Sequence, residues 1–306
     1  MGTGQPLFPF KEYKKPNQDE IDRKATFSGF FTSVNGIMAE LLGDYNSRDK
    51  EEISKHLETI TRKLESEIEG ALDLTYGGSI AKYTYINGLS DIDLLVKLNR
   101  SDLVNKQPEE VLSYFKEKLE ERFPKSDIRV GDLAVTVKFK SSNLEIQLLP
   151  SIKTATGFRI ADPETKSWSK VIKPFKFAED LTDVNQKNNG RVVPVIKLFK
   201  PIIEKAPKDI KMSGYHIEAL ATEIFKDYSG EKTYSKMLAH FCQKAKDRVL
   251  TPIGGVTGQS EYIDSKFGLA NSNLRKKLSS FLKRISLKMK LATINSSIDD
   301  WVQLLE

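Results

Sequence analysis

Two aspartates two positions apart, Asp91 and Asp93, are the residues of this sequence best suited to chemistry. They lie at the start of the apolar run Leu94 to Val96, which is typical of a buried strand. Successive side chains of a strand point to opposite faces, so both carboxylates are expected on one face, with Ile92 in the core. Two ionised carboxylates side by side repel each other, which favours a cation between them. Mg²⁺ prefers oxygen ligands and often joins carboxylates to substrate phosphates, so it is the natural candidate.

A turn of small residues precedes the aspartate pair. Gly77, Gly78 and Ser79 are predicted to begin a short helical segment, where backbone N–H groups lack partners and attract phosphate oxygens. Each signal alone is weak, because Gly-Gly-Ser turns and Asp-x-Asp pairs are common on protein surfaces. Together, and directly before an apolar strand, they predict a site for a phosphate and its metal ion.

The composition is that of a globular protein with an anionic partner. Of its 306 residues 39% are hydrophobic and 29% are charged, and the net charge is +6. This length suits one large domain or two interlocked ones. The positive charge favours nucleotides, nucleic acid or an acidic surface without choosing among them. No run of about 18 apolar residues is present, and the N-terminal segment lacks the apolar centre of a secretory signal, so no membrane association is expected.

Cysteine and histidine are too scarce for a disulfide or a zinc centre. The single cysteine, Cys242, is expected at a buried helix position and fits a reducing cytoplasm. The three histidines, His56, His216 and His240, are far apart in the sequence, so a zinc site is not expected. We interpret His216 as a structural residue of a helix. Sequence-specific binding of nucleic acid is not expected either, because no RNA-recognition motif or zinc finger is present.

Hydrophobic periodicity predicts the elements that must position the aspartates. Apolar residues at intervals of three and four predict two helices between about residues 18 and 72, separated at 43–47, the second leading as a spine directly into the Gly77 turn. Residues 151–189 are expected to form a partly irregular connector. The other predicted elements are a helix at 108–123, strands at 133–139 and 144–150 joined by a hairpin at 141–143, and helices at 191–204, from 214 onward after Ser213 as N-cap, and through 274–285.

The turn and the aspartate pair resemble a known signature. The pattern consists of Gly78-Ser79, Thr84 five residues on, and Ser90-Asp91-Ile92-Asp93-Leu94. It resembles that of the DNA polymerase beta-like nucleotidyltransferases. The resemblance implies that Gly78 and Ser79 contact a triphosphate. It also implies that Asp91 and Asp93 hold two catalytic ions, Mg²⁺ or Mn²⁺.

The sequence departs from this family's pattern on the strand 144–150. The family has a third aspartate just before the last apolar pair of this strand, and here that position is Gln147. An amide offers a carbonyl oxygen to a metal but no charge, and it cannot act as a general base. Glu145, two residues earlier, is expected on the same strand face. We therefore predict that Glu145 completes the carboxylate set, with Gln147 as a secondary metal ligand or a hydrogen-bonding neighbour.

A second resemblance covers the C-terminal half. The segments Lys197–Lys200 (KLFK) and Ser213–Leu220 (SGYHIEAL) resemble the core of the cyclic-oligonucleotide synthases, the CD-NTases, which include bacterial anti-phage (CBASS) cyclases, cyclic GMP-AMP synthase and oligoadenylate synthase. The resemblance implies that Lys200 and Ser213 bind triphosphate and that Tyr215 stacks on a nucleobase. It implies an α+β fold with a polymerase beta-like core and N-terminal helices at 1–190. A mixed sheet and a spine helix would make up this core, and a helical half at 191–306 would pack on it.

The function expected from these features is synthesis of a cyclic di- or trinucleotide second messenger from ATP and other nucleoside triphosphates, in the cytoplasm of a bacterium. A downstream effector would respond to the product, and a protein activator would fit this class. Two alternatives stay open. One is a template-independent nucleotidyltransferase that acts on RNA or protein. The other is a nucleotide-binding protein without catalysis, for which Gln147 is the argument.

Overall fold

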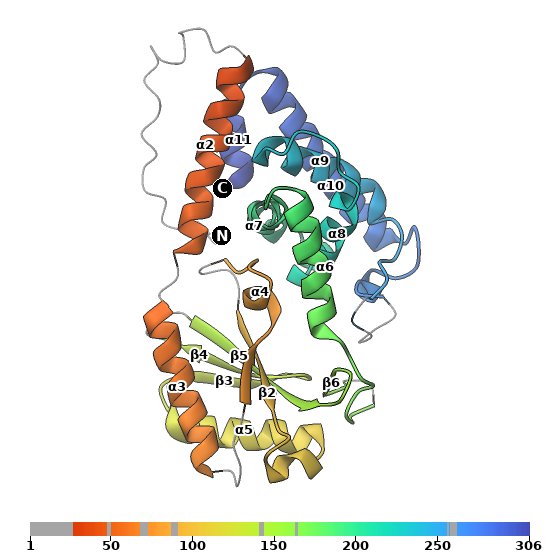
Figure 1. Ribbon diagram of the computed structural model, residues 1–306. Coiled ribbons are helices and arrows are strands. Elements are labelled where there is room, and N and C mark those ends of the chain that lie inside the picture. The colour runs from red at the N-terminus through yellow and green to blue at the C-terminus, as the bar shows by residue number, and fades with distance from the viewer. Residues whose placement is uncertain are drawn as a thin grey trace, which may run out of the picture.

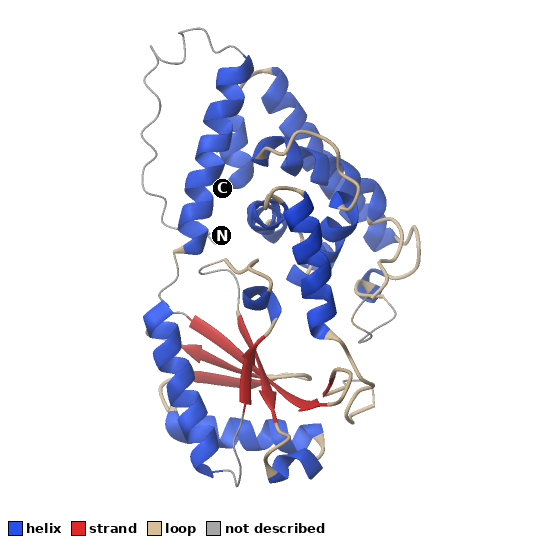
Figure 2. Ribbon diagram, in the orientation of Figure 1, coloured by secondary structure: helices blue, strands red, loops and turns tan. Residues whose placement is uncertain are grey.

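The structure is a computed structural model that describes residues 27–47, 50–67, 73–86, 91–140, 144–162, 165–255, 257 and 262–306. Within these residues a six-stranded mixed sheet occupies one end of the molecule and a layer of helices the other (Figures 1 and 2). This arrangement confirms the predicted α+β fold. The hairpin at 141–143, Ser90 of the aspartate signature, and the ends of the first two predicted helices, before residue 27 and at 68–72, lie outside the described residues.

The sheet places the aspartate-bearing strand next to the strand of Glu145. Its order is β1-β2-β5-β4-β3, with β6 paired to the end of β5. β2 and β5 run parallel, and every other pair is antiparallel. The strands are β1 (Asp73–Tyr76), β2 (Ile92–Lys97), β3 (Asp127–Val130), β4 (Val135–Phe139), β5 (Leu144–Lys153) and β6 (Phe158–Ile160).

The helices fall into two groups that lie in different parts of the molecule. Those beside the sheet are α3 (Lys50–Glu67), α4 (Gly78–Ala81) and α5 (Pro108–Arg122). Those of the helical layer are α2 (Phe27–Asn46), α6 (Pro174–Lys187), α7 (Val192–Glu204), α8 (Gly214–Phe225), α9 (Tyr234–Arg248), α10 (Asn273–Ile294) and α11 (Ile298–Leu305). Three 3₁₀ turns lie in the described connections: η1 (Asp102–Asn105) between β2 and α5, η2 (Lys208–Ile210) between α7 and α8, and η3 (Ser265–Phe267) between α9 and α10.

One face of the sheet is buried against α3 and α5, and this leaves the other face for the site. Ile92, Leu94 and Val96 of β2 are buried with Ile146 and Leu148 of β5. Because strand side chains alternate, the residues between them point to the opposite face. The prediction that the acidic side chains share one face of the sheet is therefore confirmed.

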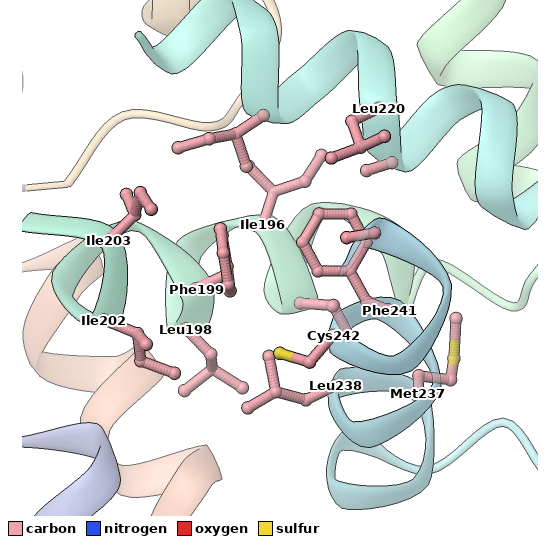
Figure 3. Close-up of a cluster of buried hydrophobic side chains, with 14 of the residues drawn as sticks. Ile196, Leu198, Phe199, Ile202, Ile203, Leu220, Met237, Leu238, Phe241 and Cys242 are labelled. Carbon is pink, nitrogen blue, oxygen red and sulfur yellow. The ribbon is translucent and has the colours of Figure 1, made fainter. Parts of the chain in front are cut away.

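A separate hydrophobic core holds the helical layer together. Figure 3 shows its centre, where Ile196 and Phe199 of α7 meet Phe241 and Cys242 of α9. The burial expected for Cys242 is confirmed, since its side chain is fully inaccessible. Both α2 and α6 pack into this core although they precede residue 190. The core of the helical layer thus includes residues from before position 190, and the domain boundary expected there stays a prediction.

Three sequence expectations about the elements were wrong. The first helix continues through residues 43–46 and ends at Asn46, because a glycine inside a helix weakens it without ending it. The second helix does not lead directly into the Gly77 turn, since β1 lies between them and pairs with β2. Residues 174–187 of the expected connector form the regular helix α6, which has Pro174 in its first turn.

The remaining predicted elements are confirmed with small shifts at their ends, namely α5, β4, β5, α7, α8 and α10. Ser213 caps α8 as predicted, and its hydroxyl accepts a hydrogen bond of 3.2 Å from the His216 backbone N–H. Among the described residues, no helix is long and apolar enough to cross a membrane.

Candidate active site

A polar cavity of about 290 Å³ lies where the sheet meets the helical layer. Gly78, Ser79, Asp91 and Asp93 line it from α4 and the start of β2. From the helical layer it is lined by Lys200 of α7 and by residues at the start of α8. Six of the nine residues that we predicted from the sequence thus meet in one cavity: Gly78, Ser79, Asp91, Asp93, Lys200 and Tyr215.

Two of the other three predicted residues line an adjoining, more apolar cavity of about 500 Å³. These are Ser213 and Gln147. The two cavities share Gly78, Lys82, Asp93 and Tyr215, so Ser213 and Gln147 lie at the border of the same region. Glu145 lines neither of them.

The Gly77-Gly78-Ser79 turn is fitted closely around Asp93. The Gly77 backbone N–H donates a hydrogen bond of 2.8 Å to the Asp93 backbone carbonyl. Gly78 has a φ of +47°, and a Cβ atom at this position would lie only 1.5 Å from Asp93 Oδ2. A side chain at position 78 would therefore collide with the carboxylate, so the site requires glycine there. The backbone N–H of Ser79 donates to the same carboxylate.

The aspartate pair is held in conditions that disfavour its charge. Burial, followed by the neighbouring Asp91 carboxylate, raises the pKa of Asp93 to about 6. Burial and the nearby Glu145 carboxylate likewise raise the pKa of Asp91. A divalent cation would relieve both effects by compensating the two charges. Carboxylate oxygens are also the donors that Mg²⁺ prefers, so Asp91 and Asp93 fit such an ion.

Gln147 occupies the position beside Asp93 on the neighbouring strand. Asp93 of β2 and Gln147 of β5 are directly paired in the parallel register. The Gln147 amide donates a hydrogen bond of 2.6 Å from Nε2 to Asp91 Oδ2. The side chain thus contacts the aspartate pair as a hydrogen-bonding neighbour, one of the two roles that we considered for it.

Glu145 is paired with cations from the neighbouring strands. Its carboxylate lies 2.7 Å from Lys138 Nζ of β4 and 3.7 Å from Arg129 Nη2 of β3. Among the described residues, no three His, Cys, Asp or Glu side chains are grouped closely enough to hold a metal ion. The predicted set of three carboxylates is therefore not assembled in this structure. A role for Glu145 beside Asp91 stays a prediction.

The helical layer supplies a cation and an aromatic ring to the cavity. Lys200 is 6% exposed, and its Nζ donates a hydrogen bond of 2.7 Å to the backbone carbonyl of Thr84. The Tyr215 ring packs edge-on against Phe177 of α6 at 4.8 Å between centroids. A positive group and a partly buried ring on one wall suit the phosphates and the base of a nucleotide.

His216 lies outside the cavity, in agreement with the structural role that we assigned to it. It is 1% exposed, and its Nε2 is 3.8 Å from Asp264. Burial lowers the pKa of His216 to about 4, so the imidazole is neutral at physiological pH.

Besides Glu204, sequence reasoning missed two charged residues of the cavity wall, Lys82 and Glu218. They are 136 positions apart, yet Lys82 Nζ lies 2.5 Å from Glu218 Oε2. Only their spacing from predicted site residues could have indicated them in the sequence. Lys82 follows Ser79 by three residues, and Glu218 follows Tyr215 by three, which places it near Tyr215 on the helix surface.

Comparison with known proteins places the chain in a family. The model of the Second Messenger Oligonucleotide or Dinucleotide Synthetase domain (SMODS) matches residues 33–185. A cyclic AMP-AMP-AMP synthase of Acinetobacter sp. (strain ATCC 27244 / 9458) is 27% identical over 169 residues, which are 54% of this chain and 47% of that protein. The match thus spans about half the length of this curated relative.

Solved structures share the fold at low sequence identity. The CD-NTase CdnG of Bradyrhizobium diazoefficiens, determined with GTP, is similar with a TM-score of 0.67 and 12% identity, over 89% of this chain and 94% of that one. Escherichia coli MS115-1 CdnC, determined in a CdnC:HORMA-deltaN complex, gives 0.61 and 16%, over 88% and 95%. Escherichia coli DncV, bound to 3'-deoxy GTP, gives 0.63 and 10%, over 91% and 85%. With the family match and the aspartate cavity, the conclusion is that this chain belongs to the second-messenger oligonucleotide or dinucleotide synthetase family, the CD-NTases.

Proposed function

We propose that this protein is a metal-dependent nucleotidyltransferase that joins nucleoside triphosphates, ATP among them, into a cyclic di- or trinucleotide. One observation carries the proposal. A single cavity combines the carboxylate pair Asp91 and Asp93 on the sheet side with Lys200 and Tyr215 on the helical side. This combination offers metal ligands, a phosphate-binding cation and a base-stacking ring to one substrate.

In the proposed reaction a ribose hydroxyl of one nucleotide attacks the α-phosphorus of another, and pyrophosphate leaves. The new P–O bond replaces the bond to the pyrophosphate oxygen, and the hydroxyl proton passes to solvent or a nearby base. Asp91 and Asp93 would hold two Mg²⁺ or Mn²⁺ ions, which lower the pKa of the attacking hydroxyl and stabilise the leaving group. Ser79 and Lys200 would hold the triphosphate in line for attack. Tyr215 would stack on a base, and a second transfer within the linear product would close the ring.

We extend the proposal to the two polar residues of β5. Glu145 would act as the third carboxylate, close to the attacking hydroxyl. Support for this comes from its charge acting on Asp91. Gln147 would orient Asp91 through its 2.6 Å hydrogen bond and offer its carbonyl oxygen as a secondary ligand.

We also propose a biological setting, the cytoplasm of a bacterium, where nucleoside triphosphates are available. The product would activate a separate effector in anti-phage (CBASS) defence. A protein activator is a further part of this proposal. The HORMA protein in the complex with the similar Escherichia coli CdnC supports a partner of this kind.

The test is an incubation of the purified protein with all four ribonucleoside triphosphates and Mg²⁺ or Mn²⁺. Mass spectrometry after phosphatase treatment would identify the products. We expect a phosphatase-resistant cyclic nucleotide that is lost in the double variant Asp91→Asn/Asp93→Asn. A linear extension of labelled RNA, with no cyclic product, would instead support the transferase that acts on RNA.

A second candidate function is nucleotide binding without catalysis. Gln147 in place of an acid, together with the engagement of Glu145 by Lys138 and Arg129, favours it. If the wild-type protein binds ATP and yields no product even with bacterial lysate added as a source of activator, this second function is supported over synthesis.

A further inference from the structure

Three charged side chains form a buried cluster in the wall of the cavity. Glu218 of α8 is 1% exposed, and it lies 2.5 Å from Lys82 Nζ and 3.7 Å from Lys200 Nζ. The side chains of Lys82 and Lys200 are themselves 11% and 7% exposed. The Thr84 hydroxyl donates a hydrogen bond to Glu218 Oε1, and the Thr84 carbonyl accepts one from Lys200.

The cluster joins three elements from both halves of the molecule. Lys82 directly follows α4 on the sheet side, whereas Lys200 and Glu218 lie on α7 and α8. A carboxylate this deeply buried requires compensation, and here two ammonium groups provide it. The carboxylate balances only one of the two positive charges, so one positive charge remains in the cluster.

Both ammonium groups keep hydrogen-bonding capacity for a ligand. An ammonium has three N–H donors. Lys200 directs one to Thr84 O at 2.7 Å and lies near Glu218, while Lys82 contacts Glu218. Both lysines line the cavity, so donors are left for an anion that enters it.

The position of Lys82 narrows the class of anion. Its Nζ lies 5.4 Å from the centroid of the Tyr215 ring and 5.1 Å from that of Phe177. Its positive charge also partly offsets the rise in the pKa of Asp93, which lines the same cavity. An anion held by Lys82 and Lys200 would thus share the cavity with the aspartate pair and the Tyr215 ring, as the phosphates of a nucleoside triphosphate would.

We propose that Lys82 is a second polyphosphate-binding residue beside Lys200, and that Glu218 is a positioning residue that fixes both ammonium groups for this purpose. This inference rests on the proposed function for the identity of the nucleotide. It differs from that function in assigning the recognition of the β- and γ-phosphates to a cluster that spans the two halves. Lysine side chains are long and flexible, and the buried carboxylate holds their ends in fixed places.

The test measures binding of ATP, AMP and inorganic tripolyphosphate in Mg²⁺ by calorimetry. Lys82→Met should weaken the binding of ATP and tripolyphosphate by roughly 10- to 100-fold and leave the affinity for AMP nearly unchanged. A lost hydrogen bond to a charged group is worth about that factor. Glu218→Gln should weaken the same two ligands by about tenfold. In the Lys82→Met background its effect should be smaller, because one of the two groups that it positions is already gone.

Two controls separate positioning from a general loss of structure. Glu223→Gln removes another carboxylate of α8. Glu223 is paired with Arg248 at 2.5 Å and does not line the cavity, so this substitution should leave all three affinities unchanged. The double variant Lys82→Met/Glu218→Gln removes one charge of each sign, so it tests the cluster even if Glu218→Gln alone does not fold.

If Lys82→Met weakens the binding of ATP and of AMP by the same factor, the assignment of Lys82 to polyphosphate binding is overturned. Independent, multiplicative effects of the two substitutions would overturn the positioning role of Glu218. Failure of the proposed function looks different. A wild-type protein that makes no cyclic nucleotide, yet shows these differences in tripolyphosphate binding, would keep the cluster and remove the reaction.

Discussion

Asp93 is expected to destabilise the metal-free protein at neutral pH, so that Asp93→Asn should stabilise it. Burial and the Asp91 carboxylate raise the pKa of Asp93 from 3.8 to about 6. The folded protein thus binds this proton more tightly than the unfolded chain does, and ionisation of Asp93 costs folding free energy. The cost is nearly absent below the unfolded pKa, grows between the two values, and is constant above the folded one. At about 1.4 kcal/mol per pKa unit, the full cost is about 3 kcal/mol.

The assay is thermal unfolding in EDTA at two pH values. At pH 8 the Asp93→Asn variant should unfold about 5 °C above the wild type. At pH 5, where most of the folded wild-type protein is protonated at Asp93, about half of the free-energy gain should remain. Addition of Mg²⁺ at pH 8 should narrow the difference, because the ion binds the folded wild type more tightly than the variant.

The control is Asp73→Asn on β1, an exposed carboxylate that lies 3.3 Å from Lys97 Nζ at the far end of the site strand. Its removal should bring no such gain. The reasoning is refuted if Asp93→Asn is no more stable than the wild type at pH 8 in EDTA, or if its gain is the same at both pH values.

Three further predictions concern other parts of the molecule. Gly78→Ala should lower the midpoint of unfolding, and it should lower the yield of product more than tenfold, because its Cβ would lie 1.5 Å from the Asp93 carboxylate; a fully active variant would show that the turn can move. Glu145→Gln should reduce the rate of product formation by roughly 10- to 100-fold with ATP affinity nearly unchanged, and an unchanged rate would exclude Glu145 from the carboxylate set. Arg275→Met should cost about 3 to 5 kcal/mol in urea unfolding, because it leaves the buried Asp264 without its partner at 2.6 Å; a cost under about 1 kcal/mol would contradict this.

Strand geometry made the acidic face of the sheet predictable from the sequence. Side chains alternate along a strand, so the position of Ile92 in the core determined that Asp91 and Asp93 would lie on the other face. The same rule placed Glu145 and Gln147 together. The cap of α8 was equally local, since Ser213 needs only the backbone N–H of His216 three residues later.

Features that depend on distant partners could not be predicted in this way. The four residues of β1 form a strand because they pair with β2, and their own pattern is too short to signal it. The pairing of Lys82 with Glu218 joins segments that only the packed halves bring together. The helix α6 does carry a readable pattern in Phe177, Leu181 and Val184, but its many charged residues obscured that spacing.

The ion pairs of Glu145 do not exclude it from the carboxylate set. Its partners Lys138 and Arg129 have side chains that are 36% and 58% exposed, and ion pairs this exposed are typically worth about 0 to 1 kcal/mol. Coordination of a divalent ion already held by Asp91 would outweigh that loss, since the ion carries twice the charge of either partner and lies in a less hydrated place. A carboxylate at position 147 would instead face Asp93 directly and raise the pKa of the pair further. The amide there keeps one carboxylate fewer at the centre of the site, which agrees with the role that we propose for Glu145 at its edge.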